Sequence, residues 1–108
     1  MKVRQPVTSG SGLELTAIFD ALRDPIRREI VRRLAKGEQI CASFADLGSP
    51  SGLSYHFTRL RTAGLTSTRK EGTCKAISLR TAALDAAFPG LLASVLTSIA
   101  SEERRRSQ

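Results

Sequence analysis

One segment, residues 49–72, constrains the fold of this chain more than any other part of it. Ser49 is a favourable helix N-cap, and Pro50 suits the first helical turn because an N–H there would have no helical partner. Gly64 is a residue of the kind that commonly ends a helix. Apolar side chains between these signals recur at helical spacing, so one face of the predicted helix should pack into a core. They are Leu53, Phe57 and Leu60.

The other face of this predicted helix, with its flanks, is polar and carries no acidic residue. Helix geometry of about 100° per residue turns hydroxyls, a tyrosine and arginines away from the apolar stripe. A solvated helix face more often carries Glu and Lys pairs, so we predict a binding face. A surface tyrosine without a role is the alternative. The predicted binding residues are Ser51, Ser54, Tyr55, Thr58 and Arg59.

Beyond this helix, two runs rich in Thr and Ser, residues 65–70 and 73–80, flank Glu71 and Gly72. Two such strands around a two-residue turn that ends in glycine predict a β-hairpin. Basic side chains near the turn suit a wing that reaches a nucleic-acid backbone or minor groove. A merely solubilising hairpin is the alternative. The basic residues are Arg69, Lys70 and Lys75.

Two further helices are expected upstream. The first covers residues 13–22, and the second begins at the N-cap Asp24 with Pro25 in its first turn. A short helix over residues 41–47 follows, and Gly48 separates it from the polar-faced helix. Two helices joined by a tight turn that contains glycine make a helix-turn-helix.

The chain of 108 residues is expected to form one domain. We predict a mainly α fold with a small β-hairpin, a winged helix-turn-helix of element order α-α-α-α-β-β-α. A short helical run at 81–88 leads to the last helix, which should begin at Pro89. The domain should cover residues 13–101, between a flexible tail at 1–12 and a charged tail at 102–108 that frays.

The first and last helices carry wide apolar faces that a domain of this size does not obviously cover by itself. A two-fold homodimer through these helices would bury them and place two DNA-reading helices about one DNA turn apart. Packing of both helices on their own domain is the alternative. The predicted interface consists of Leu15, Ile18, Phe19, Leu92, Val95, Leu96 and Ile99.

The charge of the chain favours a polyanionic partner. It has 17 Lys and Arg against 10 Asp and Glu, and residues 49–80 carry six basic residues and one acid. The basic residues do not oppose a Trp/Phe/Leu face, as a helix at a membrane surface would require. We therefore predict double-stranded DNA as the partner and no membrane. With no apolar signal-peptide core at the start and no run of 18 apolar residues, a cytoplasmic protein is expected.

Catalytic and metal-binding patterns are weak. His56 is the single histidine, no nucleophile pairs with it at recognisable spacing, and no phosphate-binding or dinucleotide-binding glycine motif is present. A helix-packing or phosphate-bonding role is expected for it. Cys41 and Cys74 are far apart in sequence and should be free thiols. We therefore predict no enzyme, no cofactor and no metal site, since a metal needs three or four ligands in set geometry.

Two stretches resemble the ArsR-type winged-helix regulators. Residues 19–30, Phe-Asp-Ala-Leu-Arg-Asp-Pro-Ile-Arg-Arg-Glu-Ile, are similar to the opening of that family. Residues 53–65, Leu-Ser-Tyr-His-Phe-Thr-Arg-Leu-Arg-Thr-Ala-Gly-Leu, are similar to its recognition helix. The resemblance covers about residues 13–79. It implies a homodimeric, sequence-specific transcriptional regulator with a hairpin wing, usually a repressor, acting on a pseudo-palindromic operator.

The chain also departs from the pattern of that family. Some metal-sensing members carry a Cys-Val-Cys-like motif where this chain has Ile40-Cys41-Ala42. Members that sense zinc or nickel use histidines and acidic residues in the last helix, where this chain has no histidine. Tyr55 stands where the family commonly has His, and Gly52 where it commonly has Thr. The DNA-site preference of the family therefore cannot be carried over.

Two alternative functions remain open on the same fold. One is a thiol-based redox-responsive regulator in which Cys41 or Cys74 reacts, which requires an exposed thiol with a lowered pKa or two thiols close enough to bridge. The other is a co-regulator that needs a separate effector-binding partner protein.

Overall fold

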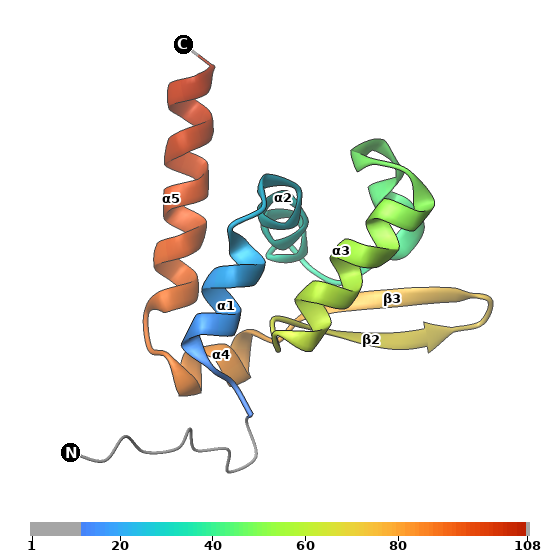
Figure 1. Cartoon of the computed structure of the whole chain (residues 1–108), viewed down its shortest axis with the longest axis horizontal. Coiled ribbons are helices and arrows are strands. Elements are labelled where there is room, and N and C mark those ends of the chain that lie inside the picture. The colour runs from blue at the N-terminus through green and yellow to red at the C-terminus, as the bar shows by residue number, and fades with distance from the viewer. Residues whose placement is uncertain (1–11, 108) are drawn as a thin grey trace.

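The computed structural model describes residues 12–107 of the chain. Figure 1 shows a cluster of helices from which a β-hairpin projects to one side. The predicted fold class, a mainly α winged helix-turn-helix, is confirmed. The elements are α1 (Leu15–Leu22), α2 (Pro25–Leu34), β1 (Gln39–Ile40), the 3₁₀ helix η1 (Cys41–Leu47), α3 (Pro50–Thr62), β2 (Thr66–Glu71), β3 (Cys74–Leu79), α4 (Thr81–Ala87) and α5 (Leu91–Arg106).

Both predicted N-caps are confirmed. The Asp24 carboxylate accepts hydrogen bonds from the backbone N–H of Ile26 at 2.7 Å and of Arg27 at 3.2 Å. Ser49 Oγ accepts one from the backbone N–H of Gly52 at 3.2 Å. Each cap satisfies N–H groups that the first helical turn leaves without partners. Local chemistry therefore sets where α2 and α3 begin.

The sheet differs from the prediction in two respects. Strands β2 and β3 pair with Glu71 opposite Cys74, so the turn is Gly72-Thr73 rather than the predicted Glu71-Gly72. Gly72 has a φ of +65°, which a residue without Cβ adopts readily. The unpredicted strand β1 adds to β3, giving the order β1-β3-β2. Two residues are too few to show the alternation by which a strand is recognised.

Three helix boundaries or types also differ. Segment 41–47 is a 3₁₀ helix rather than an α-helix. The last helix begins at Leu91 rather than Pro89, after Gly90 with a φ of +83°. It continues to Arg106, so residues 102–106, which were expected to fray, are helical. The predicted flexible tail lies outside the described residues, except for Gly12.

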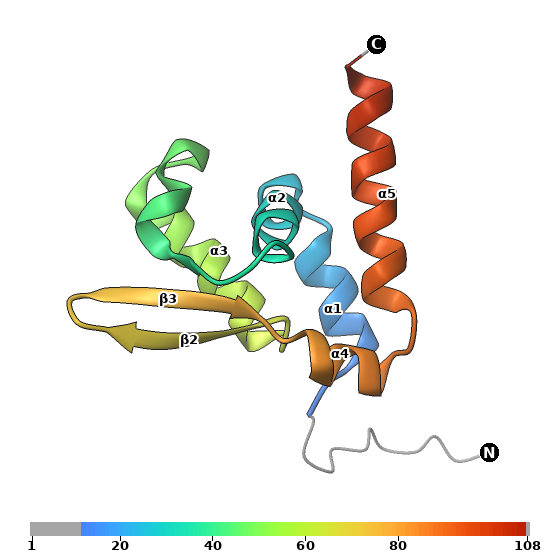
Figure 2. The same ribbon diagram turned by 180° about the vertical axis from the view of Figure 1, so that it is seen from behind.

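The core lies between the helices and the inner face of the sheet. Its fully buried side chains come from α1, α2, η1, α3, β3 and the segment between α3 and β2: Ile18, Ile30, Val31, Phe44, Leu60, Leu65 and Ile77. Figures 1 and 2 place α5 and the hairpin on opposite sides of this core, with α3 beside the hairpin. In the described range, no single helix is long and apolar enough to cross a membrane; α4 and α5 reach that length and composition only as a pair bent by 112°.

The outer helices correct part of the predicted dimer interface. Ile18 and Leu92 are 1% and 6% exposed and belong to the core of the chain itself. They hold α1 and α5 in place and present nothing to a partner. Leu15 and Phe19 are instead 42% and 53% exposed. The other predicted interface residues, Val95, Leu96 and Ile99, are half-buried.

Candidate nucleic-acid interface

Helix α3 has the two faces that its sequence predicts. Leu53 and Leu60 are buried, and Phe57 is half-buried against the core. The Phe57 ring meets Phe44 of η1 edge-on, with ring centroids 5.6 Å apart. Edge-to-face contact is a favoured aromatic arrangement and it fixes the rotation of α3 on η1. The opposite side of α3 must therefore face outward.

The outward side of α3 carries the predicted binding residues. Ser51, Ser54, Tyr55 and Thr58 are exposed, and the Tyr55 side chain is among the most exposed large apolar groups, at 58%. The side of the helix that holds them has no acidic residue. An exposed row of hydroxyls without neighbouring carboxylates can donate hydrogen bonds to a polyanion without repelling it.

Arg59 is less free than the sequence indicates. It forms an ion pair with Asp20 of α1, and its guanidinium carbon lies 6.0 Å from the centroid of the Tyr55 ring. The ion pair links α1 to α3 and gives the Arg59 side chain a defined direction. The carboxylate also offsets part of the positive charge that Arg59 would offer to a phosphate.

The hairpin divides its basic residues between two faces, because successive side chains of a strand alternate. Arg69 lies on the face opposite to Lys70. It pairs with Glu71 and, at 2.6 Å, with Glu38, which also accepts a hydrogen bond from Ser78 Oγ at 2.8 Å. Hydrogen bonds from Ser78 and Arg69 lower the pKa of the Glu38 carboxyl, so it stays ionised and neutralises Arg69.

Lys70 and Lys75 stand directly opposite each other across the two strands. Both are exposed, and within residues 12–107 neither takes part in an ion pair. Two like charges facing each other in an antiparallel pair destabilise it. An anion bound between or near the two lysines would relieve such repulsion. Lys70 and Lys75 are therefore the basic residues of the hairpin that are best suited to bind an anion.

His56 has a structural partner. The buried Arg27 donates from its side chain to the Ala21 carbonyl at 2.6 Å and lies 3.2 Å from His56 Nδ1. Because an arginine side chain can only donate, His56 Nδ1 is the acceptor in this contact. His56 thus joins α3 to the α1–α2 corner, in line with the helix-packing role expected for it.

The two cysteines are free, and their settings differ. Cys74 is exposed, whereas Cys41 is half-buried at the start of η1. Burial raises the pKa of the Cys41 thiol, although the nearby charge of Lys75 acts in the opposite direction. A raised pKa lowers the thiolate fraction and so disfavours Cys41 as a reactive redox thiol. No group of three or more His, Cys, Asp or Glu side chains that could hold a metal occurs in the part of the chain that the structure describes.

Comparison with known proteins identifies a relative among the transcriptional regulators. No protein-family model matches the chain. The chain is 40% identical over 81 residues to the uncharacterized HTH-type transcriptional regulator YceK of Bacillus subtilis, a match that spans 69% of this chain and 79% of YceK.

Solved structures share the fold. An ArsR-like transcriptional regulator from Rhodococcus sp. RHA1 superposes with a TM-score of 0.60 at 29% identity, covering 85% of this chain and 84% of that one. The homodimeric winged helix-turn-helix DNA-binding domain of Mb0332 from Mycobacterium bovis superposes with a TM-score of 0.57 at 21% identity, over 86% of this chain and 78% of that one.

Proposed function

Because this chain belongs to the ArsR-type winged helix-turn-helix family of transcriptional regulators, we propose that it binds a pseudo-palindromic DNA operator as a homodimer and represses transcription. The observation that carries the proposal is the outward side of α3. It is exposed, rich in hydroxyls and free of acidic residues, and α3 lies beside the hairpin that carries Lys70 and Lys75 (Figure 1), neither of which forms an ion pair within residues 12–107.

Base discrimination is assigned to the middle of α3. Tyr55 and Thr58 stand where base edges of the major groove would lie, and Arg59, aligned by Asp20 and Tyr55, reaches the same side. Ser51 and Ser54 lie near the helix N-terminus, where free N–H groups favour phosphate. Their role is to hold the DNA backbone in register.

Phosphate contacts from the hairpin are assigned to Lys70 and Lys75. Neither forms an ion pair with a carboxylate of residues 12–107, so each can offer its charge to a phosphate. Arg69 has a smaller role than the sequence suggests, because Glu38 and Glu71 already neutralise it. The wing thus acts through its face towards α3 rather than through all its basic residues.

The homodimer interface is assigned to the exposed parts of α1 and α5. A groove between these helices is lined by Phe19, Val95 and Ile99, with Leu15 exposed nearby on α1. Burying apolar side chains of this kind contributes roughly 25 cal/mol per Å² of surface removed from water. The related fold of Mb0332 is described as homodimeric, which favours the same arrangement here.

Binding-site selection from random DNA, followed by affinity measurements on the selected operator and on random sequence, tests this function. Tyr55→Ala should lower operator affinity by about 1–3 kcal/mol while changing random-DNA affinity little, because a base contact discriminates between sequences and a phosphate contact does not. Tyr55→Phe separates the hydroxyl from the ring.

Thermal melting serves as the control, and it should be nearly the same for both variants because Tyr55 is 58% exposed. An unchanged ratio of operator to random-DNA affinity in Tyr55→Ala and in Arg59→Ala would contradict the assigned reading face. Absence of any selected sequence would contradict the proposed function itself.

A further inference from the structure

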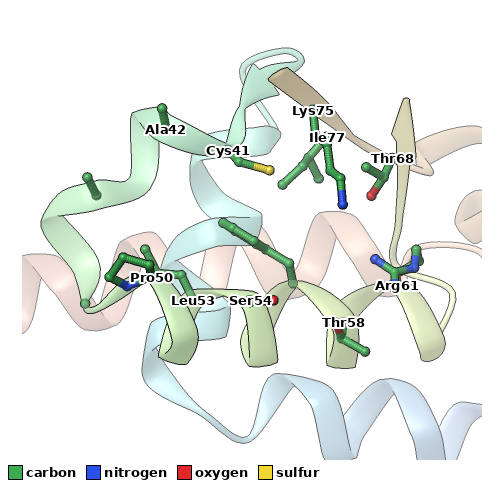
Figure 3. Close-up of a pocket in the computed structure, with 13 residues that line it drawn as sticks. Cys41, Ala42, Pro50, Leu53, Ser54, Thr58, Arg61, Thr68, Lys75 and Ile77 are labelled. Atoms are coloured by element: carbon green, nitrogen blue, oxygen red, sulfur yellow. The ribbon is translucent and has the colours of Figure 1, made fainter. Parts of the chain in front are cut away.

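A cavity of about 460 Å³ lies between η1, α3 and the hairpin, beside the proposed DNA-reading face. Its volume falls in the range of small-molecule sites, about 300–1,000 Å³. Figure 3 shows Cys41 directed into it from η1, with Lys75 and Thr68 reaching in from the strands and Arg61 from α3. Side chains from η1, α3 and both strands of the hairpin therefore converge on one cavity.

The two ends of this cavity differ in chemistry. Lys75, Thr68 and Arg61 gather at one end, and Pro50 and Ala42 lie towards the other (Figure 3). Further apolar wall comes from Leu53, Phe57 and Ile77. Among the described residues, none that lines the cavity is acidic. An occupant that fits both ends has an apolar body and one negatively charged head.

The cations at the polar end are available. Arg61 and Lys75 form no ion pair within residues 12–107, whereas Arg59 and Arg69 are both paired with carboxylates. The planar guanidinium of Arg61 suits a carboxylate, with which arginine forms paired hydrogen bonds. The Cys41 thiol, kept neutral because burial raises its pKa, adds a weakly polar wall without a repelling negative charge.

We propose that this cavity binds a small organic monocarboxylate with an apolar body, and that the bound acid competes with DNA. The competition follows from shared residues. Ser54 and Thr58 line the cavity and also belong to the proposed reading face, and Lys75 is a proposed phosphate contact. A carboxylate bound to Lys75 would neutralise a positive charge on the DNA-binding surface of the protein. The apolar part of the acid would contact the α3 side chains that are proposed to read DNA. This role of effector site rests on the proposed function.

The first measurement needs no DNA. Calorimetric titration of the full chain with 2-naphthoate should give one site per chain. Neutral 2-naphthamide, which lacks the negative charge, should bind at least about tenfold more weakly than 2-naphthoate. Acetate, which lacks the large apolar group, should also bind at least about tenfold more weakly. Arg61→Gln should weaken the binding of 2-naphthoate by about tenfold and change the binding of 2-naphthamide little. Lys36 is an exposed cation outside the cavity, so Lys36→Gln should change the affinity for neither ligand.

A second readout uses the two cysteines within one molecule. Alkylation of Cys41 should slow by about tenfold at a 2-naphthoate concentration ten times its Kd, since only about a tenth of the sites remain free. Cys74, which does not line the cavity, should react at an unchanged rate. Equal protection of both thiols, or of neither, would overturn the site.

A third measurement tests the competition with DNA at the same ligand concentrations. 2-Naphthoate at ten times its Kd should weaken operator binding by about tenfold, and 2-naphthamide should not. If Cys41 is protected while operator affinity is unchanged, the competition is refuted. If operator binding is intact and 2-naphthoate does not bind, the effector site is refuted and the proposed function stands. If no DNA binds at all, the proposed function fails, and the calorimetry and alkylation still decide the site.

Discussion

At the scale of single residues, the arginines near the proposed interface are chemically alike but placed differently. Arg59 is held by Asp20 and Arg69 by Glu38 and Glu71, whereas Arg61 has no carboxylate partner among residues 12–107. A paired arginine brings less net charge to a phosphate, because its carboxylate stays nearby. Only unpaired cations should therefore contribute their full charge to binding an anion.

Gly64, which ends α3, is the residue at which backbone conformation and packing both exclude a side chain. Its φ is +88°, and a Cβ placed on it would collide with Leu13 Cδ2 and lie 3.3 Å from Arg80 Nη1. Gly64→Ala should lower the free energy of unfolding by about 1–3 kcal/mol, as strained backbone typically costs. Thermal or urea unfolding measures the loss.

Gly37→Ala is the matched control for that substitution. Gly37 also has a positive φ, +141°, but no atom lies within 4 Å of its added Cβ. The Gly37→Ala variant should lose less stability than the Gly64→Ala variant. Its new side chain adopts a strained backbone conformation but does not collide with a neighbouring side chain. An equal loss in the two variants would mean that the contact with Leu13 and Arg80 contributes nothing.

At the scale of elements, the hairpin separates its charges by face. Lys70 and Lys75 share the face towards α3, and Arg69 lies on the other face with Glu38. Salt dependence of DNA binding can distinguish the two faces. Each phosphate contact contributes about −0.9 to the slope of log K against log salt concentration.

Lys70→Ala should therefore make that slope shallower by about one when affinity is measured over a series of salt concentrations. Arg69→Ala should make it shallower by clearly less. Arg104→Ala, near the end of α5 and away from the wing, controls for the change in net charge and should leave the slope unaltered (Figure 1). A larger effect of Arg69→Ala than of Lys70→Ala would show that the ion pairs with Glu38 and Glu71 open on DNA binding.

At the scale of the whole molecule, α5 lies on the side of the core away from the hairpin, with α1 beside it (Figure 2), and α1 exposes the apolar side chains of Leu15 and Phe19. Phe19 is 53% exposed, so residues 12–107 leave this surface open. A dimer through this side would leave both α3 helices and both hairpins free for DNA.

Phe19→Glu should therefore give monomers by light scattering and weaken operator binding, because the buried charge would lack a partner in the interface. Ile40→Glu is a matched control, since Ile40 on β1 is 43% exposed and lies outside the proposed interface. Leu92→Glu should instead unfold the chain, because Leu92 is 6% exposed and part of the core. A dimeric Phe19→Glu variant would place the interface elsewhere.

Much of the fold follows from local sequence signals. Asp24 and Ser49 set the starts of α2 and α3, because an N-cap satisfies N–H groups only two or three residues ahead. The apolar stripe of α3 determines which side turns outward, because helix periodicity places side chains by their spacing alone. The sequence therefore predicts the helix-turn-helix, the hairpin and the side of α3 on which the candidate site lies.

What the tertiary structure decided concerns residues that are distant in sequence. Asp20 lies 39 positions from Arg59, and Glu38 lies 31 from Arg69, so no local pattern indicates that these arginines are paired. The cavity and strand β1 likewise exist only because η1, α3 and the hairpin pack together. Helix caps and apolar periodicity depend on residues a few positions apart, so the sequence alone determines the helices that they define. Ion pairs, exposure and enclosed volume depend on which surfaces meet, and only packing sets that.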